Sequence, residues 1–168
     1  MTPKPTVKAP SGWATVKPQE SPHQDGWLSD VDATDRASAT LAVGCKAAPS
    51  LDGMTPVNAR EGILDRSGEP GVALVLGFAD ESSAARFQKA WIDQMHACSS
   101  DVVTQVASEQ GYWAGHHVID GATWTESSKM TGQQVSFIAV QGKLSAEQTR
   151  TLMAAQQLSL IHISEPTR

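Results

Sequence analysis

The sequence lacks the motifs by which many enzymes are recognised. It contains no GxSxG, no HExxH, no P-loop and no GxGxxG. Its carboxylates are scattered along the chain without a pairing that suggests general acid–base chemistry. No reaction can therefore be named from the residues, and we expect neither catalysis nor a bound cofactor or metal.

Long apolar runs and basic clusters are also missing. No run approaches the roughly 18 residues that span a bilayer, and no apolar signal-peptide core follows Met1. The formal net charge is −5 and Lys and Arg are dispersed, so we do not expect nucleic acid as a partner. The 168 residues amount to one domain, long enough to bury a real core.

Cysteine is scarce, with Cys45 and Cys98 alone in the chain. Their spacing fits neither a zinc ribbon nor a CxxC redox motif. Two interpretations follow. The cysteines form a disulfide in an oxidising compartment, or they are unrelated buried thiols of a cytosolic protein.

Composition divides the chain into three parts. Residues 1–26 are rich in proline and poor in large apolar residues, which predicts a disordered, extended linker. Trp13 is the exception there, and we expect an exposed aromatic rather than one docked on the domain. Residues 27–157 form a single predicted α+β domain, and residues 158–168 are considered separately below.

The first half of the domain gives uneven signals. The earlier part of residues 27–45 predicts a short helix with Ser29 or Asp30 as N-cap, ahead of a short apolar patch from Leu41 to Val43 that leads into Cys45. Residues 46–62 read as a loop or an irregular edge. The apolar run 72–78 predicts a buried strand, and Asp80 is placed to cap the helix that follows.

Apolar residues recur every three or four positions in that helix, which predicts one buried face. They are Ala84, Phe87, Trp91, Met95 and Cys98. The polar residues Arg86, Lys89, Asp93 and Gln94 are expected largely away from this face.

Antiparallel strands and a final helix are predicted after residue 100. Turn signals at "EQG" and "IDG" separate β-rich segments, and "QQVSFIAV" reads as a strand. Ser145 and Gln148 form a capping box at the start of the last helix. The predicted class is α+β, an antiparallel sheet with helices packed on one face.

Two histidines and two tryptophans are the candidates for a binding site. His116 and His117 are neighbours, so on a strand they point to opposite faces and cannot easily share a metal. Trp113 and Trp124 belong to an aromatic-rich stretch that either lines a ligand groove or fills the core. We take Trp113, His116 and Trp124 as speculative ligand-binding residues.

The final segment "LSLIHISEPTR", residues 158–168, resembles a translated sequencing adapter. In one reading frame, the transposase adapter used in library preparation encodes every one of these residues in order. We therefore exclude the segment from fold reasoning and expect the native protein to continue differently after Gln157.

The stretch from Cys45 to Cys98 combines a Pro-bearing loop, the strand "GVALVLGFAD" and the helix "SSAARFQKAWIDQMHAC", and strands with "YWAGHHV" follow. This order resembles the extracellular sensor-like domains of actinobacteria, which include the PknH-type kinase ectodomain and related lipoproteins and secreted proteins. The resemblance covers residues 40–142. The chain departs from it in having one possible disulfide where the kinase ectodomains have two, and in lacking their Cys-Pro dipeptide.

The resemblance implies a Cys45–Cys98 disulfide, an extracytoplasmic location and a ligand cleft. The ligand would be a small molecule or a cell-envelope component. A membrane would be reached only through an N-terminal anchor encoded upstream of Met1. Two alternatives stay open, a small cytosolic enzyme with His116 or His117 as general base and a structural protein–protein interaction domain.

Sequencing of the native locus through both ends of this reading frame tests these expectations. We expect different residues after Gln157 and an apolar or lipobox segment before Met1. An encoded "LSLIHISEPTR", together with a ribosome-binding site directly before Met1, would overturn the adapter interpretation and favour the cytosolic alternatives.

Overall fold

A computed structural model describes residues 12–16 and 28–161. These described residues form three helices and an eight-stranded antiparallel sheet. The elements are β1 (Ala14–Val16), β2 (Ser29–Asp30), α1 (Ala33–Ala42), β3 (Asn58–Arg66), β4 (Glu69–Gly77), α2 (Glu81–His96), β5 (Val103–Glu109), β6 (Tyr112–Ile119), β7 (Ala122–Thr131), β8 (Gln134–Gln141) and α3 (Ala146–Ile161). No helix of the described residues is long and apolar enough to cross a membrane.

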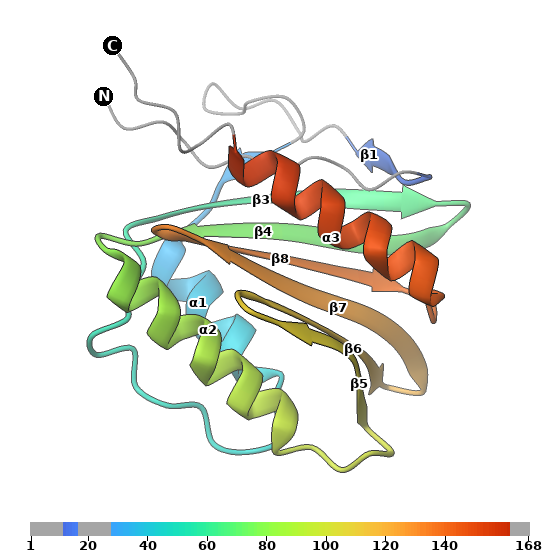
Figure 1. The fold of residues 1–168 in the computed structure, drawn as a ribbon, viewed down its shortest axis with the longest axis horizontal. Coiled ribbons are helices and arrows are strands. Elements are labelled where there is room, and N and C mark those ends of the chain that lie inside the picture. Colours follow the sequence, from blue (N-terminus) through green and yellow to red (C-terminus); the bar gives the residue numbers. More distant parts are fainter. Residues whose placement is uncertain (1–11, 17–27, 162–168) are drawn as a thin grey trace.

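The strands lie in the order β1-β3-β4-β8-β7-β6-β5, and β2 also pairs with β3 (Figure 1). Tight turns connect the hairpins β3–β4, β6–β7 and β7–β8. Ser67 and Asp120 adopt positive φ angles there, each followed by a glycine, as expected for two-residue hairpin turns. At the β5 edge, the pairing with β6 shifts register between Gln105 and Ala107, which is a β-bulge.

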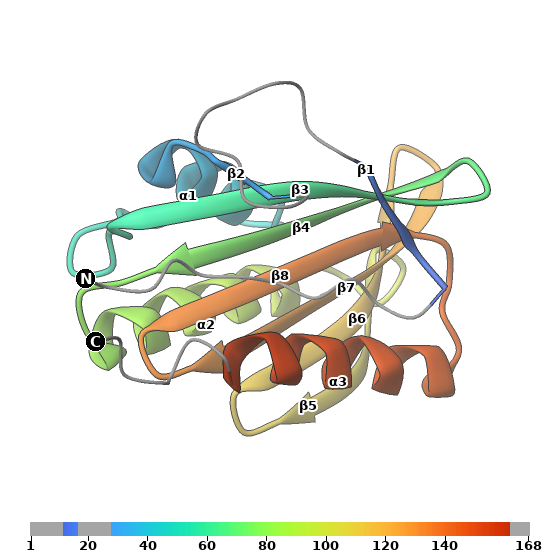
Figure 2. The same ribbon diagram turned by 90° about the horizontal axis from the view of Figure 1, so that it is seen from above.

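Helices cover both faces of the sheet (Figure 2). Leu74 of β4 and Phe137 of β8 lie in the cluster beneath α1 and α2. Val75 and Ile138, one position further along each strand, lie in a cluster with Leu152 of α3. The predicted α+β class and antiparallel sheet are confirmed, but the helices do not all pack on one face. The central strands are apolar on both faces, so each face needs a cover.

The second helix follows its predicted pattern closely. Ala84, Phe87, Trp91 and Met95 are buried against the sheet. Asp80 is the N-cap and accepts a hydrogen bond from the Ser83 backbone N–H at 2.7 Å. That bond lowers the pKa of the Asp80 carboxyl below its ordinary value because it favours the charged form.

The predicted capping box opens α3. The Ser145 N–H donates to Gln148 Oε1 at 2.8 Å, and the Gln148 N–H donates to Ser145 Oγ at 3.2 Å. The helix continues to Ile161, so it includes the first residues of the adapter-like segment, and residues 162–168 lie outside the described residues. The origin of that segment stays a prediction.

Two predictions for the first half of the domain are wrong. Helix α1 is capped by Asp32, which accepts from the Asp35 N–H at 2.8 Å, whereas Ser29 and Asp30 form β2. Strand β3 begins at Asn58, inside the segment predicted as a loop. The strand was not recognised because charged residues break the expected alternation of apolar and polar residues. One of them, Arg60, is buried and pairs with Asp30.

Trp13 is docked on the domain, which corrects the expectation of an exposed aromatic. It is 8% exposed, and the Arg66 guanidinium lies 4.7 Å from the centre of its ring. The adjoining β1 pairs with β3. These residues fall within the predicted linker, of which residues 1–11 and 17–26 lie outside the described residues.

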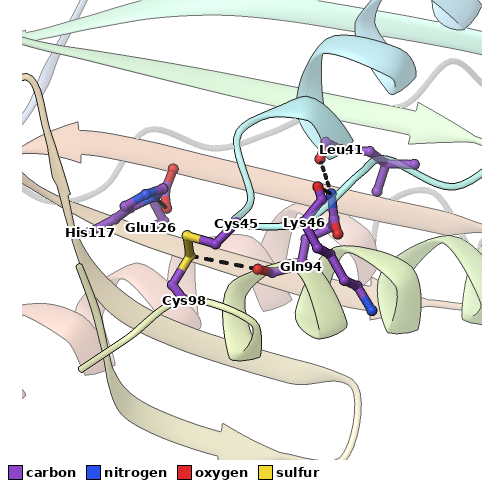
Figure 3. The surroundings of a disulfide bond; sticks show 7 residues. All are labelled: Leu41, Cys45, Lys46, Gln94, Cys98, His117 and Glu126. Carbon is purple, nitrogen blue, oxygen red and sulfur yellow. Dashed lines mark hydrogen bonds and ion pairs between the residues drawn. A yellow bond between two sulfur atoms is a disulfide. The ribbon is translucent and has the colours of Figure 1, made fainter. Parts of the chain in front are cut away.

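The Cys45–Cys98 disulfide is present and joins the loop after α1 to the end of α2 (Figure 3). Cys45 lies in the loop between α1 and β3. The buried Gln94 holds the same corner, since its Nε2 donates to Leu41 O at 2.7 Å and to Lys46 O at 3.0 Å. Gly44 passes so close that a Cβ there would lie 2.3 Å from Gln94 Cβ. Gln94 was predicted on the polar side of α2, and it is buried because α1 and its loop pack on that side.

The substitution Cys45→Ser is expected to lower the free energy of unfolding by about 4 kcal/mol. The disulfide closes a separation of 53 residues, and the chain-entropy model gives this figure for such a loop. Urea denaturation of the wild type and the variant measures it. Thiol titration of the unreduced, denatured wild type is expected to find no free thiol, and two free thiols would contradict the bond.

Candidate functional site

The three speculative ligand-binding residues do not share one surface. Trp113 is 1% exposed and packs edge-on against Trp91 of α2, with ring centres 5.2 Å apart. Its Nε1–H donates to Gln105 Oε1 at 2.7 Å. Trp113 is thus a core residue with its polar group satisfied.

His116 lies on the opposite face of the sheet from Trp113, because the two are three residues apart on β6. Its Nε2–H donates to the Leu144 carbonyl oxygen at 3.1 Å. Leu144 N–H in turn donates to Thr125 Oγ1 at 3.0 Å. His116 therefore fixes the segment that leads into α3.

Trp124 is half-buried and lies on the same face as Trp113, since it pairs in register with His117. It neighbours a part of the sheet outside the apolar cluster under α1 and α2. Ile63, Val72 and Ala139 form one row across that part, and Gln141 pairs with Trp124 in the next. Ile63 is 54% exposed. We call these five residues the Trp124 surface.

A buried hydrogen-bonded pair lies at the margin of the Trp124 surface. His117 Nδ1–H donates to Glu126 Oε1 at 2.7 Å, and the two residues are 4% and 8% exposed. Figure 3 shows the pair on the same side of the sheet as the disulfide. The sequence analysis did not identify Glu126 as the partner of His117. The signal was the Asp120-Gly121 turn, because a hairpin through that turn pairs His117 with Trp124 and places Glu126 two residues later on the same face.

The general-base hypothesis gains little from these contacts. A base held by a carboxylate also needs a reachable substrate or nucleophile, and His117 is almost fully enclosed. His116 is engaged with a backbone carbonyl. Within residues 12–16 and 28–161, no group of three His, Cys, Asp or Glu side chains is placed to hold a metal ion.

The opposite face carries two cavities, one on each side of α3. The first, the Trp13 cavity, has a volume of about 220 Å³ and is lined by Trp13, Arg66, Leu144, Glu147, Gln148, Thr151 and Leu152. The second has a similar volume of about 220 Å³ and lies between α3 and β5, beside Tyr112 and Arg150. Burial raises the pKa of the Tyr112 phenol above its ordinary value, so it stays protonated near Thr149 O, at 3.5 Å. Sequence analysis missed both cavities because they depend on the placement of α3.

No protein-family model and no curated protein sequence matches this chain. The crystal structure of the extracellular domain of PknH from Mycobacterium tuberculosis resembles it with a TM-score of 0.55 and 10% sequence identity. The match covers 93% of this chain and 86% of the other. At this identity the likeness shows a shared fold, in agreement with the fold that the sequence resemblance implied.

Replacement of Glu126 by Ala is expected to lower the free energy of unfolding by about 1–3 kcal/mol, because it leaves a buried His117 donor without its acceptor. Chemical denaturation at neutral pH measures the change. Glu61→Ala is the matched control, since Glu61 pairs with Arg36 at 3.2 Å in a partly exposed position, where a pair contributes about 0–1 kcal/mol. Equal changes in the free energy of unfolding would show that the buried pair stabilises the fold no more than the partly exposed pair does.

Proposed function

We propose that this chain is a non-enzymatic, extracytoplasmic ligand-binding module of the sensor type. The observation that carries the proposal is the fold shared with the extracellular domain of PknH. A domain of that fold in a kinase receptor is placed to meet ligands outside the cell.

The Cys45–Cys98 bond supports the compartment in this proposal. Disulfides persist in oxidising environments and are rare in the cytosol. Cys45 is exposed and Cys98 is half-buried, so reducing agents of a cytosol would reach the bond. The Pro-rich N-terminal sequence fits a spacer to a membrane anchor.

The Trp124 surface is the proposed ligand contact. It brings together an indole, the apolar side chains of Ile63 and Val72, and the amide of Gln141, and the buried His117–Glu126 pair stiffens its margin. Binding sites typically combine apolar walls with a few fixed polar groups. Of the three residues first considered, Trp124 alone is retained in this proposal, because Trp113 is enclosed and His116 lies on the other face.

Tryptophan fluorescence of the full chain tests the proposal with defined probes, namely a disaccharide–peptide fragment of the cell wall, a free amino acid mixture and a phosphorylated sugar. At least one probe is expected to produce a saturable change, and Trp124→Ala is expected to weaken that binding at least tenfold, the loss of about 1.4 kcal/mol.

Val118→Ala is the control, because Val118 is 42% exposed on the neighbouring strand and points to the opposite face of the sheet. It should leave the affinity unchanged. The proposed site is wrong if Trp124→Ala binds every responding probe as tightly as the wild type does.

A further inference from the structure

The Trp13 cavity is open to a ligand on the face opposite the Trp124 surface. Its volume of about 220 Å³ corresponds to roughly seven water molecules at ~30 Å³ each. Leu144 and Leu152 form an apolar floor that belongs to the core cluster of this face. Thr151, Gln148 and Glu147 add a hydroxyl, an amide and a carboxylate from the first turns of α3.

One wall of the cavity belongs to a short and separable strand. Trp13 precedes β1, which pairs with β3 through only three residues, Ala14 to Val16. Trp13 itself packs with the same two leucines that form the floor. If β1 left the sheet edge, the cavity would lose its indole wall.

The attachment of β1 depends on Trp13. Backbone pairing with β3 involves only three residues of β1, whereas the Trp13 indole is 8% exposed and lies in the core cluster of this face, with the Arg66 guanidinium 4.7 Å from its centre. Docked and undocked states of β1 therefore differ mainly in whether this indole is buried. A ligand that binds only the docked state shifts such an equilibrium.

The lining indicates the kind of ligand. Arg66 is the cation in the lining, and Glu69 offsets its charge at 3.1 Å, while Glu147 is the carboxylate in the lining. A strongly charged ligand would therefore meet a repulsive or already neutralised group. Leucine and indole walls with guanidinium, amide and carboxylate groups suit a ring with an apolar C–H face and hydroxyl groups at its edge.

We propose that the Trp13 cavity binds an uncharged polyhydroxylated ring of monosaccharide size, and that this binding holds β1 against the domain. By linkage, docking of β1 raises the affinity for the ring by the same factor. The inference goes beyond the Trp124 surface and does not depend on it. In a tethered sensor, the ring would set how firmly the N-terminal segment is held at the sheet edge.

Hydrogen–deuterium exchange of the full chain, followed in peptides that contain residues 14–16, tests the proposal. The probes are glucose, arabinose and N-acetylglucosamine, each titrated to 50 mM. When the free concentration of a probe is ten times its dissociation constant, the exchange of β1 amides that requires undocking is expected to slow about elevenfold, by the factor 1 + [L]/Kd. No slowing with any of these probes would overturn the proposal.

Variants of α3 locate the effect. Thr151→Trp fills the cavity and is expected to abolish the response to the probe, whereas Ala154→Trp adds the same side chain at an exposed position of the same helix and is expected to retain it. Trp13→Ala should speed exchange of residues 14–16, because it removes the buried indole that attaches β1 to the domain. A response that survives Thr151→Trp would place the probe elsewhere.

Trp124→Ala separates this proposal from the proposed function. The exchange response is expected to persist in that variant, because the two sites lie on opposite faces of the sheet. Loss of the response in Trp124→Ala alone would assign the probe to the Trp124 surface and overturn the assignment to the cavity.

Discussion

The architecture depends on burial of the two central strands on both faces. Leu74 and Leu76 of β4 face α1 and α2, while Ala73 and Val75 face α3, and all four are almost completely inaccessible. Each fully buried aliphatic side chain contributes about 1.5–3 kcal/mol, so neither face can be left open along these strands. The candidate sites lie outside these buried regions, with the Trp124 surface beyond the cluster under α1 and α2 and the two cavities beside α3.

Sequence reasoning succeeded where one local pattern decides the outcome. The helical stripe from Ala84 to Met95 and the capping box at Ser145 needed no knowledge of distant residues. It failed where the deciding partner is remote in sequence. Strand β3 looks polar in the sequence because it contains Arg60, whose pairing with Asp30 of another strand cannot be read locally. Gln94 looks exposed in the sequence, but the loop around residue 44 packs over it.

The same distinction explains the candidate site. Trp124 was chosen because it belongs to an aromatic-rich stretch that either lines a groove or fills the core, and the structure places it half-buried, opposite His117 on the neighbouring strand. Trp113 and His116 were chosen on the same grounds, but strand alternation sends them to opposite faces, and one of those faces is covered by α2. The general-base hypothesis gains little support for a related reason, since both histidines have hydrogen-bond partners that the register of the sheet supplies.

The two edges of the sheet are protected by different means. The β3 edge is capped by the short strands β1 and β2, and β5, at the other end of the strand order, carries the register shift near Val106. Bulges and short covering strands are ways in which proteins prevent edge-to-edge association. Release of β1 would therefore uncover unpaired backbone groups of β3 along Ile63, Leu64 and Asp65, and the domain would gain a template for strands of other chains. A short stretch of a segment that looks like a simple spacer thus covers part of the β3 edge.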